Sequence, residues 1–152
     1  MPINNIEVQN AIEVQKRFEQ DLVGLRGAPM IAAVRQAAMI VEGTAKRYAK
    51  VDTGRYRASI EPEVKGHGDL VQGVVGSNVV YAPYAVLDTR PHWPPLSAVT
   101  LWARRHGISA YLVARAISRR GTKGDRSLMR GVDENVDRIA QILDQAINRI
   151  IS

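Results

Sequence analysis

The sequence contains no cysteine among its 152 residues, which rules out disulfides, thiol catalysis and thiolate metal sites together. Aromatic residues make up only 5% of the chain, so few side chains are available to stack on nucleic-acid bases. No apolar run is long enough to span a bilayer, and residues 1–5 lack the basic and apolar regions of a secretory signal. We therefore expect a protein that is synthesised in the cytoplasm, has no membrane partner and depends on packing for its stability.

The residue patterns of common catalytic and metal sites are also missing. The three histidines, His67, His92 and His106, stand in separate turns or loop edges without the spacing of a zinc site. Residues 76–78 lack the second glycine of a nucleophile elbow, and residues 121–124 lack the spacing of a phosphate-binding loop. We therefore predict no catalytic residue, no metal ligand and no cofactor.

The composition is that of one globular domain over residues 1–152, with 45% hydrophobic and 24% charged residues. Apolar residues recur at spacings of three and four, the period of a helix face, and glycine or proline follows several of these runs. We expect helices over about residues 6–25, 30–48, 97–106, 109–120 and 128–151. The first belongs to an N-terminal segment, about residues 1–27, that is peripheral to the domain. In the fourth helix we expect an inward face formed by Leu112, Val113, Ala116 and Ile117.

Extended structure is predicted in the middle of the chain. Apolar and polar residues alternate from Ala58 to Val64, which is the period of a strand with one buried face. A turn over residues 65–69 leads to a second strand from about residue 70 to 75, extending towards Val80. Gly73 and Gly76 in this strand indicate a bulge or a close backbone approach. The predicted class is α+β: a small antiparallel hairpin sheet packed against several helices, with long helices near both ends of the chain.

Asp52-Thr53-Gly54 marks the change from helix to sheet. Asp and Thr side chains can bond to their own backbone and Gly tolerates positive φ, so the triplet predicts a tight turn. The same triplet carries the catalytic carboxylate of retroviral-type aspartic proteases, which share two carboxylates across a dimer. That loop follows an apolar strand in an all-strand fold, whereas Asp52 follows a helix that ends in Arg47-Tyr48-Ala49-Lys50. A protease stays an alternative that this context disfavours.

The net charge of +6 is concentrated in one part of the chain. Residues 100–130 hold eight bases and one acid, Asp125, a net of +7, whereas the rest holds thirteen bases and fourteen acids. The bases of this segment are Arg104, Arg105, Arg115, Arg119, Arg120, Lys123, Arg126 and Arg130. They predict either a solvated surface or a contact with an anionic partner such as nucleic-acid phosphates, so a basic nucleic-acid-binding protein is a second alternative.

Two loops flank the helices of this basic segment. Residues 88–95 contain three prolines, which prevent a regular ladder, and they carry an aromatic residue, Trp93. Such a loop packs back on the domain or awaits a partner. Residues 121–127 form a basic, glycine-containing loop, which is typical of a mobile segment.

Three short segments resemble a known family: the small neck or tail-completion proteins of long-tailed bacteriophages, the gene-product-ten-like family of lambdoid siphophages. Residues 51–60 are similar to the family's Val-Asp-Thr-Gly turn and the Arg-x-Ser-Ile strand that follows it, with Lys50 where Pro is usual and Tyr56 where Leu is usual. The family's Val-Gly-Ser and Tyr-Ala-x-Tyr elements resemble Val75-Gly76-Ser77 and Tyr81-Ala82-Pro83-Tyr84. Residues 117–123 resemble a late Ile-x-x-x-Gly-Thr segment. This sequence has Val86 where Glu is expected and Asp88 where Gly is expected.

The resemblance implies a non-enzymatic virion protein at the neck or tail, where it takes part in head–tail connection or tail completion. Its partners would be further copies of itself in a ring, of which a hexamer is one form, and the adjoining connector and tail proteins. DNA would pass close by in the lumen. A ring of identical chains needs heterologous interfaces that close.

Two sets of residues follow from the resemblance. The motif residues, for which local turn and hairpin geometry is the favoured role, are Val51, Asp52, Thr53, Gly54, Arg57, Ser59, Tyr81, Ala82 and Tyr84. The residues expected to contact neighbouring subunits or connector proteins are Trp93, Gly121, Thr122, Lys123 and Arg126, with the loop that holds the last four ordering on assembly.

Overall fold

A computed structural model describes residue 16 and residues 27–67 and 70–152. The helix expected over residues 6–25 and the peripheral N-terminal segment therefore lie outside the described residues, apart from Lys16, which is helical, and Gly27. No helix among the described residues is both long enough and apolar enough to cross a bilayer.

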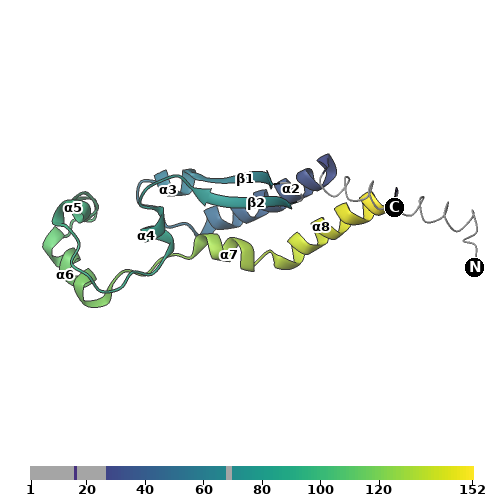
Figure 1. Ribbon diagram of the computed structural model, residues 1–152. Coiled ribbons are helices and arrows are strands. Elements are labelled where there is room, and N and C mark those ends of the chain that lie inside the picture. The colour runs from purple at the N-terminus through teal and green to yellow at the C-terminus, as the bar shows by residue number, and fades with distance from the viewer. Residues whose placement is uncertain (1–15, 17–26, 68–69) are drawn as a thin grey trace, which may run out of the picture. The chain divides into compact units, whose positions relative to one another are not determined.

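The described chain is an α+β protein with one two-stranded antiparallel sheet, which confirms the predicted class (Figure 1). Three helices before and after the sheet match the expected ones closely: α2 (Ala28–Tyr48), α5 (Leu96–Arg105) and α6 (Ala110–Arg120). The strands are β1 (Ile60–His67) and β2 (Leu70–Ser77). The remaining elements are α3 (Arg55–Ala58), α4 (Ala82–Val86), α7 (Ser127–Asp133) and α8 (Val136–Ile151).

The described chain divides into two compact units, and each has its own core. Unit 1 comprises the described parts of Met1–Ile40, Pro62–Val74 and Asn135–Ser152; unit 2 comprises Val41–Glu61 and Val75–Glu134. A single domain over residues 1–152 stays a prediction.

The core of unit 1 lies between the first half of α2, strand β2 and helix α8. Met30 and Ala33 from α2 and Ala146 from α8 are buried there. Partly buried apolar residues pack around them: Val34, Val71, Ile142, Leu143, Ile147 and Ile150. Gly73 of β2 lets the sheet lie close to α2, because a Cβ added at Gly73 would lie 3.0 Å from Val34 Cγ1 and 3.5 Å from Ala38 Cβ. The close approach predicted at Gly73 is confirmed, whereas Gly76 has nothing within 4 Å of such a Cβ.

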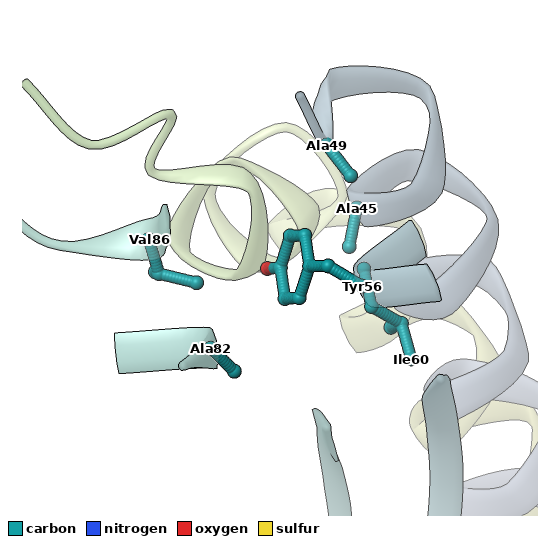
Figure 2. Packing of buried hydrophobic residues seen from close by; sticks show 6 residues of the cluster. All are labelled: Ala45, Ala49, Tyr56, Ile60, Ala82 and Val86. Carbon is teal, nitrogen blue, oxygen red and sulfur yellow. The ribbon is translucent and has the colours of Figure 1, made fainter. Parts of the chain in front are cut away.

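The core of unit 2 is built around Tyr56 and Ile60. Figure 2 shows the Tyr56 ring between Ala45 and Ala49 on one side and Val86 on the other. Ile60 is fully buried and Tyr56 is 4% exposed. The Tyr56 hydroxyl shares a hydrogen bond of 2.8 Å with the hydroxyl of Ser127, which is also fully buried. A polar pair inside an apolar cluster is therefore satisfied by its own two members.

Replacing Tyr56 with phenylalanine should lower the free energy of unfolding by about 1–3 kcal/mol, because the buried Ser127 hydroxyl loses its partner. The double variant Tyr56→Phe/Ser127→Ala should recover most of this loss, since neither polar group then remains. Urea unfolding of the wild type, the two single variants and the double variant measures the coupling. Strictly additive losses would show that the two hydroxyls do not stabilise each other.

The same variant has a pH dependence. Burial is the main cause that raises the pKa of Tyr56 above 10.0, so the folded state holds the phenol proton more tightly than the unfolded state does. The stability from this raised pKa is complete below about pH 10 and is lost as the pH rises through the raised value. The difference in unfolding free energy between wild type and Tyr56→Phe should therefore narrow above about pH 10.

Two boundaries differ from the sequence predictions. The last helix is not continuous over residues 128–151, because α7 ends at Asp133 and α8 begins at Val136. Asp and Asn, which frame this break at positions 133 and 135, are weak helix formers. The predicted first strand also begins too early, since Ala58 belongs to α3 and the strand starts at Ile60. Tyr56 lies in this turn of helix, and its side chain is buried in the core of unit 2.

Candidate assembly interface

Residues 51–60 form an elbow that is fixed by local bonds. Gly54 has a φ of 79°, the left-handed conformation that the Asp-Thr-Gly turn predicted. After α3, the Ser59 hydroxyl donates to the carbonyl of Tyr56 at 2.7 Å and lies 2.6 Å from the hydroxyl of Ser77 at the end of β2. Ser59 therefore ties the elbow to the second strand. Thr53 Oγ1 accepts a long hydrogen bond of 3.5 Å from the backbone N–H of Arg55, as the turn predicted for a threonine. Val51 and Arg57 are exposed and take no part in these bonds.

The Asp52 carboxylate is held by Arg105 at the end of α5. The Nε of Arg105 donates to Asp52 Oδ1 at 3.0 Å, and its Nη2 donates to Asp52 Oδ2. A bidentate guanidinium occupies both oxygens, whereas an aspartic protease needs its carboxylate facing a second carboxylate. The described residues also contain no group of acids and histidines able to hold a metal ion. The geometry gives Asp52 a structural partner.

Asp52→Asn should lower the free energy of unfolding by about 1 kcal/mol or less, because both members of this ion pair are partly solvated. Arg105→Lys should have a similar small effect, since it keeps the charge and loses the fork geometry. Thermal unfolding of both variants and of the double variant measures the coupling. A loss of a proteolytic activity on Asp52→Asn, with unchanged stability, would contradict the structural role.

Helix α4 presents the second motif with its tyrosines outward. Tyr84 is 67% exposed and Tyr81 is 42% exposed, while Ala82 and Val86 are buried in the core of unit 2. Val86 stands where the family has Glu, so an apolar core contact replaces the charge here. Asp88, at the family's Gly position, accepts a hydrogen bond from the backbone N–H of Gly124 at 2.9 Å. The aspartate therefore ties the segment after α4 to the loop before α7, and the valine contributes to the core.

That loop, residues 121–127, is bonded along its length, and its predicted mobility stays a prediction. Thr89 and Thr122 form an isolated antiparallel bridge, and their hydroxyls are 2.7 Å apart. The backbone N–H groups of Asp125 and Arg126 donate to the carbonyls of Ala85 and Val86. We call the paired segments Val86–Arg90 and Gly121–Arg126 the neck, because they lead into and out of the α5–α6 hairpin.

Lys50 bonds to the second segment of the neck. Its backbone N–H donates to Asp125 Oδ2 at 2.9 Å, and its Nζ donates to the carbonyl of Lys123 at 2.7 Å. Gly121 and Thr122 are partly buried within these contacts, while the side chains of Lys123 and Arg126 are exposed. Four residues of this loop were expected to contact neighbours. Of these, Gly121 and Thr122 shape the neck, and the two cations lie on the surface.

The α5–α6 hairpin leaves most of its large apolar residues exposed. The two helices pack against each other through small residues, Ala103 and Ala114, which are almost fully buried. Seven large residues of the hairpin and its leading loop stay exposed: Trp93, Leu96, Leu101, Trp102, Ile108, Tyr111 and Leu112. Leu112 and Ala116 were expected to point inward and do not. The sequence pattern is wider than the face that a two-helix contact can cover.

Aromatic residues gather on this hairpin. Trp93 from the leading loop packs edge-on against Tyr111 of α6, with ring centroids 5.7 Å apart. Trp102 stacks on His106 at 4.1 Å. The Trp93 loop thus packs back on α6 and still leaves about half of the Trp93 side chain exposed, at 52%. Tryptophan, tyrosine and arginine are the residues that most often dominate the energy of protein interfaces.

Several bases of the hairpin have no acidic partner. Arg104, Arg115, Arg119 and Arg120 are exposed, and no ion pair joins them to any acid in the described part of the chain.

Arg130 of α7 lies 4.6 Å from the centroid of the Tyr48 ring. The hydrogen bond to Glu134 is the main cause that raises the pKa of Tyr48 above 10.0, so this tyrosine keeps its proton beside the guanidinium.

Residues 13–85 match the model of a family described as "Bacteriophage HK97-gp10, putative tail-component". This range includes the elbow, both strands and the Tyr81–Tyr84 motif, and it ends before the α5–α6 hairpin. The match confirms the family resemblance that the motifs within residues 51–84 indicated, while the resemblance of residues 117–123 lies outside the matched range and stays a prediction. No curated protein and no solved structure matches the chain.

Proposed function

Because residues 13–85 carry the pattern of a phage tail-component family, we propose that this chain is a non-enzymatic structural protein of a phage or prophage virion. It acts in head–tail connection or tail completion, as one subunit of a ring at the head–tail junction of the virion. The single observation that supports self-assembly best is the exposed, aromatic-rich α5–α6 hairpin, since monomeric proteins rarely leave such a group of apolar residues in water.

Within this proposal, the Trp93 loop contacts a neighbouring subunit or an adjoining connector protein. Lys123 contributes exposed charge, as does Arg126, which pairs with Asp88 at 3.7 Å, and Gly121 and Thr122 act indirectly by shaping the neck that carries the hairpin. DNA would pass through the lumen of the ring, close to the chain, and no contact that reads its bases would be needed.

Deleting the coding sequence from the phage tests the role in the virion. Electron micrographs of the lysate should show DNA-filled heads and separate tails, and supplying the chain in trans should restore joined particles. Joined, infectious virions without the chain would contradict the proposal. A lysate that lacks tails altogether would place the chain in tail-tube assembly instead of the junction.

A nucleic-acid-binding function is the second candidate, because Arg104, Arg115, Arg119 and Arg120 lack acidic partners among the described residues. Non-specific DNA binding depends steeply on salt through the release of counterions. Retardation of duplex DNA that disappears between low and moderate salt would support this candidate, and its absence at low salt would remove it.

A further inference from the structure

Unpaired charges of opposite sign form one row on α6 and one row on α8. Four unpaired arginines lie on the α5–α6 hairpin, as described above, and three of them are on α6. Among the described residues, Asp137 and Asp144 of α8 have neither an ion pair nor a hydrogen bond to a basic side chain or the backbone, and the same holds for Glu61 of β1 and Asp133 of α7. Helix α8 also carries two exposed arginines, Arg138 and Arg149, at helical positions outside the row of Asp137 and Asp144. The described contacts of the chain neutralise neither the arginines of α6 nor these two aspartates.

The basic surface is a stripe along α6. Residues 111, 115 and 119 repeat at intervals of four, and residues 112, 116 and 120 repeat beside them, so both rows lie on one side of the helix. All six residues of the stripe are exposed: Tyr111, Leu112, Arg115, Ala116, Arg119 and Arg120. The stripe is apolar at its start and positively charged towards its end.

Helix α8 carries an exposed stripe with the same spacing and the opposite charge. Val136, Ala140 and Asp144 repeat at intervals of four, with Asp137 and Gln141 beside them, and all five are exposed. Val136 is 53% exposed, whereas Ala146 of the same helix is buried in the core of unit 1. An apolar residue at the start and carboxylates along the stripe complement the α6 pattern.

We propose that the α6 stripe of one subunit docks on the α8 stripe of the next copy of this chain. A heterologous interface joins two different surfaces of identical chains, which must then complement each other in shape and charge. Tyr111 and Leu112 contact Val136 and Ala140, and Arg115 and Arg119 pair with Asp137 and Asp144. This inference rests on the proposed ring and names the surfaces that would close it.

Two charge-reversal variants of the full chain test the docking. The basic-surface variant is Arg115→Glu/Arg119→Glu, and the acidic-surface variant is Asp137→Arg/Asp144→Arg. Each should raise the concentration needed for self-assembly by roughly a hundredfold, since like charges then face each other. Sedimentation velocity of each chain reads out assembly, and far-UV circular dichroism checks that each variant is folded. Arg35→Glu, which reverses an exposed arginine of α2 outside both stripes, is the matched control and should assemble as the wild type does.

Mixing the two variants is the decisive step. Each retains the surface that the other has lost, so the equimolar mixture should assemble at concentrations where each variant alone is monomeric. A mixture that stays monomeric, or single variants that assemble as the wild type does, would overturn the proposed docking while leaving a wild-type ring intact. A wild-type chain that is monomeric at every concentration would overturn both the docking and the ring. If the basic-surface variant assembles normally but no longer retards duplex DNA, the stripe binds nucleic acid and the docking is wrong.

Discussion

Replacing Gly121 with alanine is expected to destabilise the protein by about 3–5 kcal/mol. Gly121 ends α6 with a φ of 68° and a ψ of −161°, a conformation that residues with a Cβ strongly avoid. A Cβ at this position would also lie 1.9 Å from the carbonyl oxygen of Thr89. Backbone atoms cannot rotate away as a flexible side chain can, so the two segments of the neck would have to separate.

Gly107→Ala is the control for this substitution. Gly107 has a similar φ of 66°, yet a Cβ there would meet nothing within 4 Å. Its replacement should cost about 1–2 kcal/mol, the penalty of the left-handed conformation alone. Urea unfolding of both variants gives the difference. Equal losses at the two sites would show that the close approach of Gly121 to Thr89 does not hold the neck together.

Gly131→Ala should lower the free energy of unfolding by about 1–3 kcal/mol, although alanine is the better helix former. Gly131 is buried in α7, and a Cβ there would lie 2.8 Å from the carbonyl oxygen of Val41 and 3.3 Å from Ala45 Cβ. The glycine thus lets α7 approach the second half of α2 at backbone distance. An added methyl group would push the two helices of unit 2 apart.

The matched substitution in α2 should have the opposite sign. Gly43 is exposed in the middle of α2 and has nothing within 4 Å of an added Cβ. Gly43→Ala should therefore stabilise the protein by roughly 0.5–1 kcal/mol through helix propensity alone. Parallel thermal unfolding of the two variants is the measurement. A stabilising Gly131→Ala would show that α7 does not pack closely on α2.

The helices α2, α5 and α6 could be predicted because their signals are local. Each has an apolar repeat of three and four, and Gly107 and Gly121 end α5 and α6 with the positive φ that only glycine adopts readily. The elbow was predictable for the same reason, since Gly54 needs no distant partner to favour its turn.

The contacts of the neck and of Asp52 could not be predicted, because their partners are distant in sequence. Lys50 and Asp125 are 75 residues apart, and Asp52 and Arg105 are 53 residues apart. A glycine-rich, basic loop looks mobile in sequence, and only the structure shows that Asp88 and Asp125 hold it. Gly121 and Gly124 also lie too close to backbone carbonyls to accept a Cβ, so the glycines of the loop have a packing role.

The inward face of α6 was predicted wrongly in part, and the error is informative. Leu112 and Ala116 continue the apolar stripe, but α5 covers only the side that contains Ala114. A stripe that is wider than its intramolecular contact leaves apolar surface for another molecule. The misassigned residues are therefore those that the proposed ring would cover.

Gold labelling of a tagged copy of this chain in intact virions tests the central claim most directly. A tag after Ser152, detected by antibody-bound gold in electron micrographs, should mark the junction between head and tail in a single cluster on each particle. Labelling along the length of the tail would contradict a structural role at the head–tail junction. Virions that carry no label while the tagged chain complements the deletion would contradict it as well.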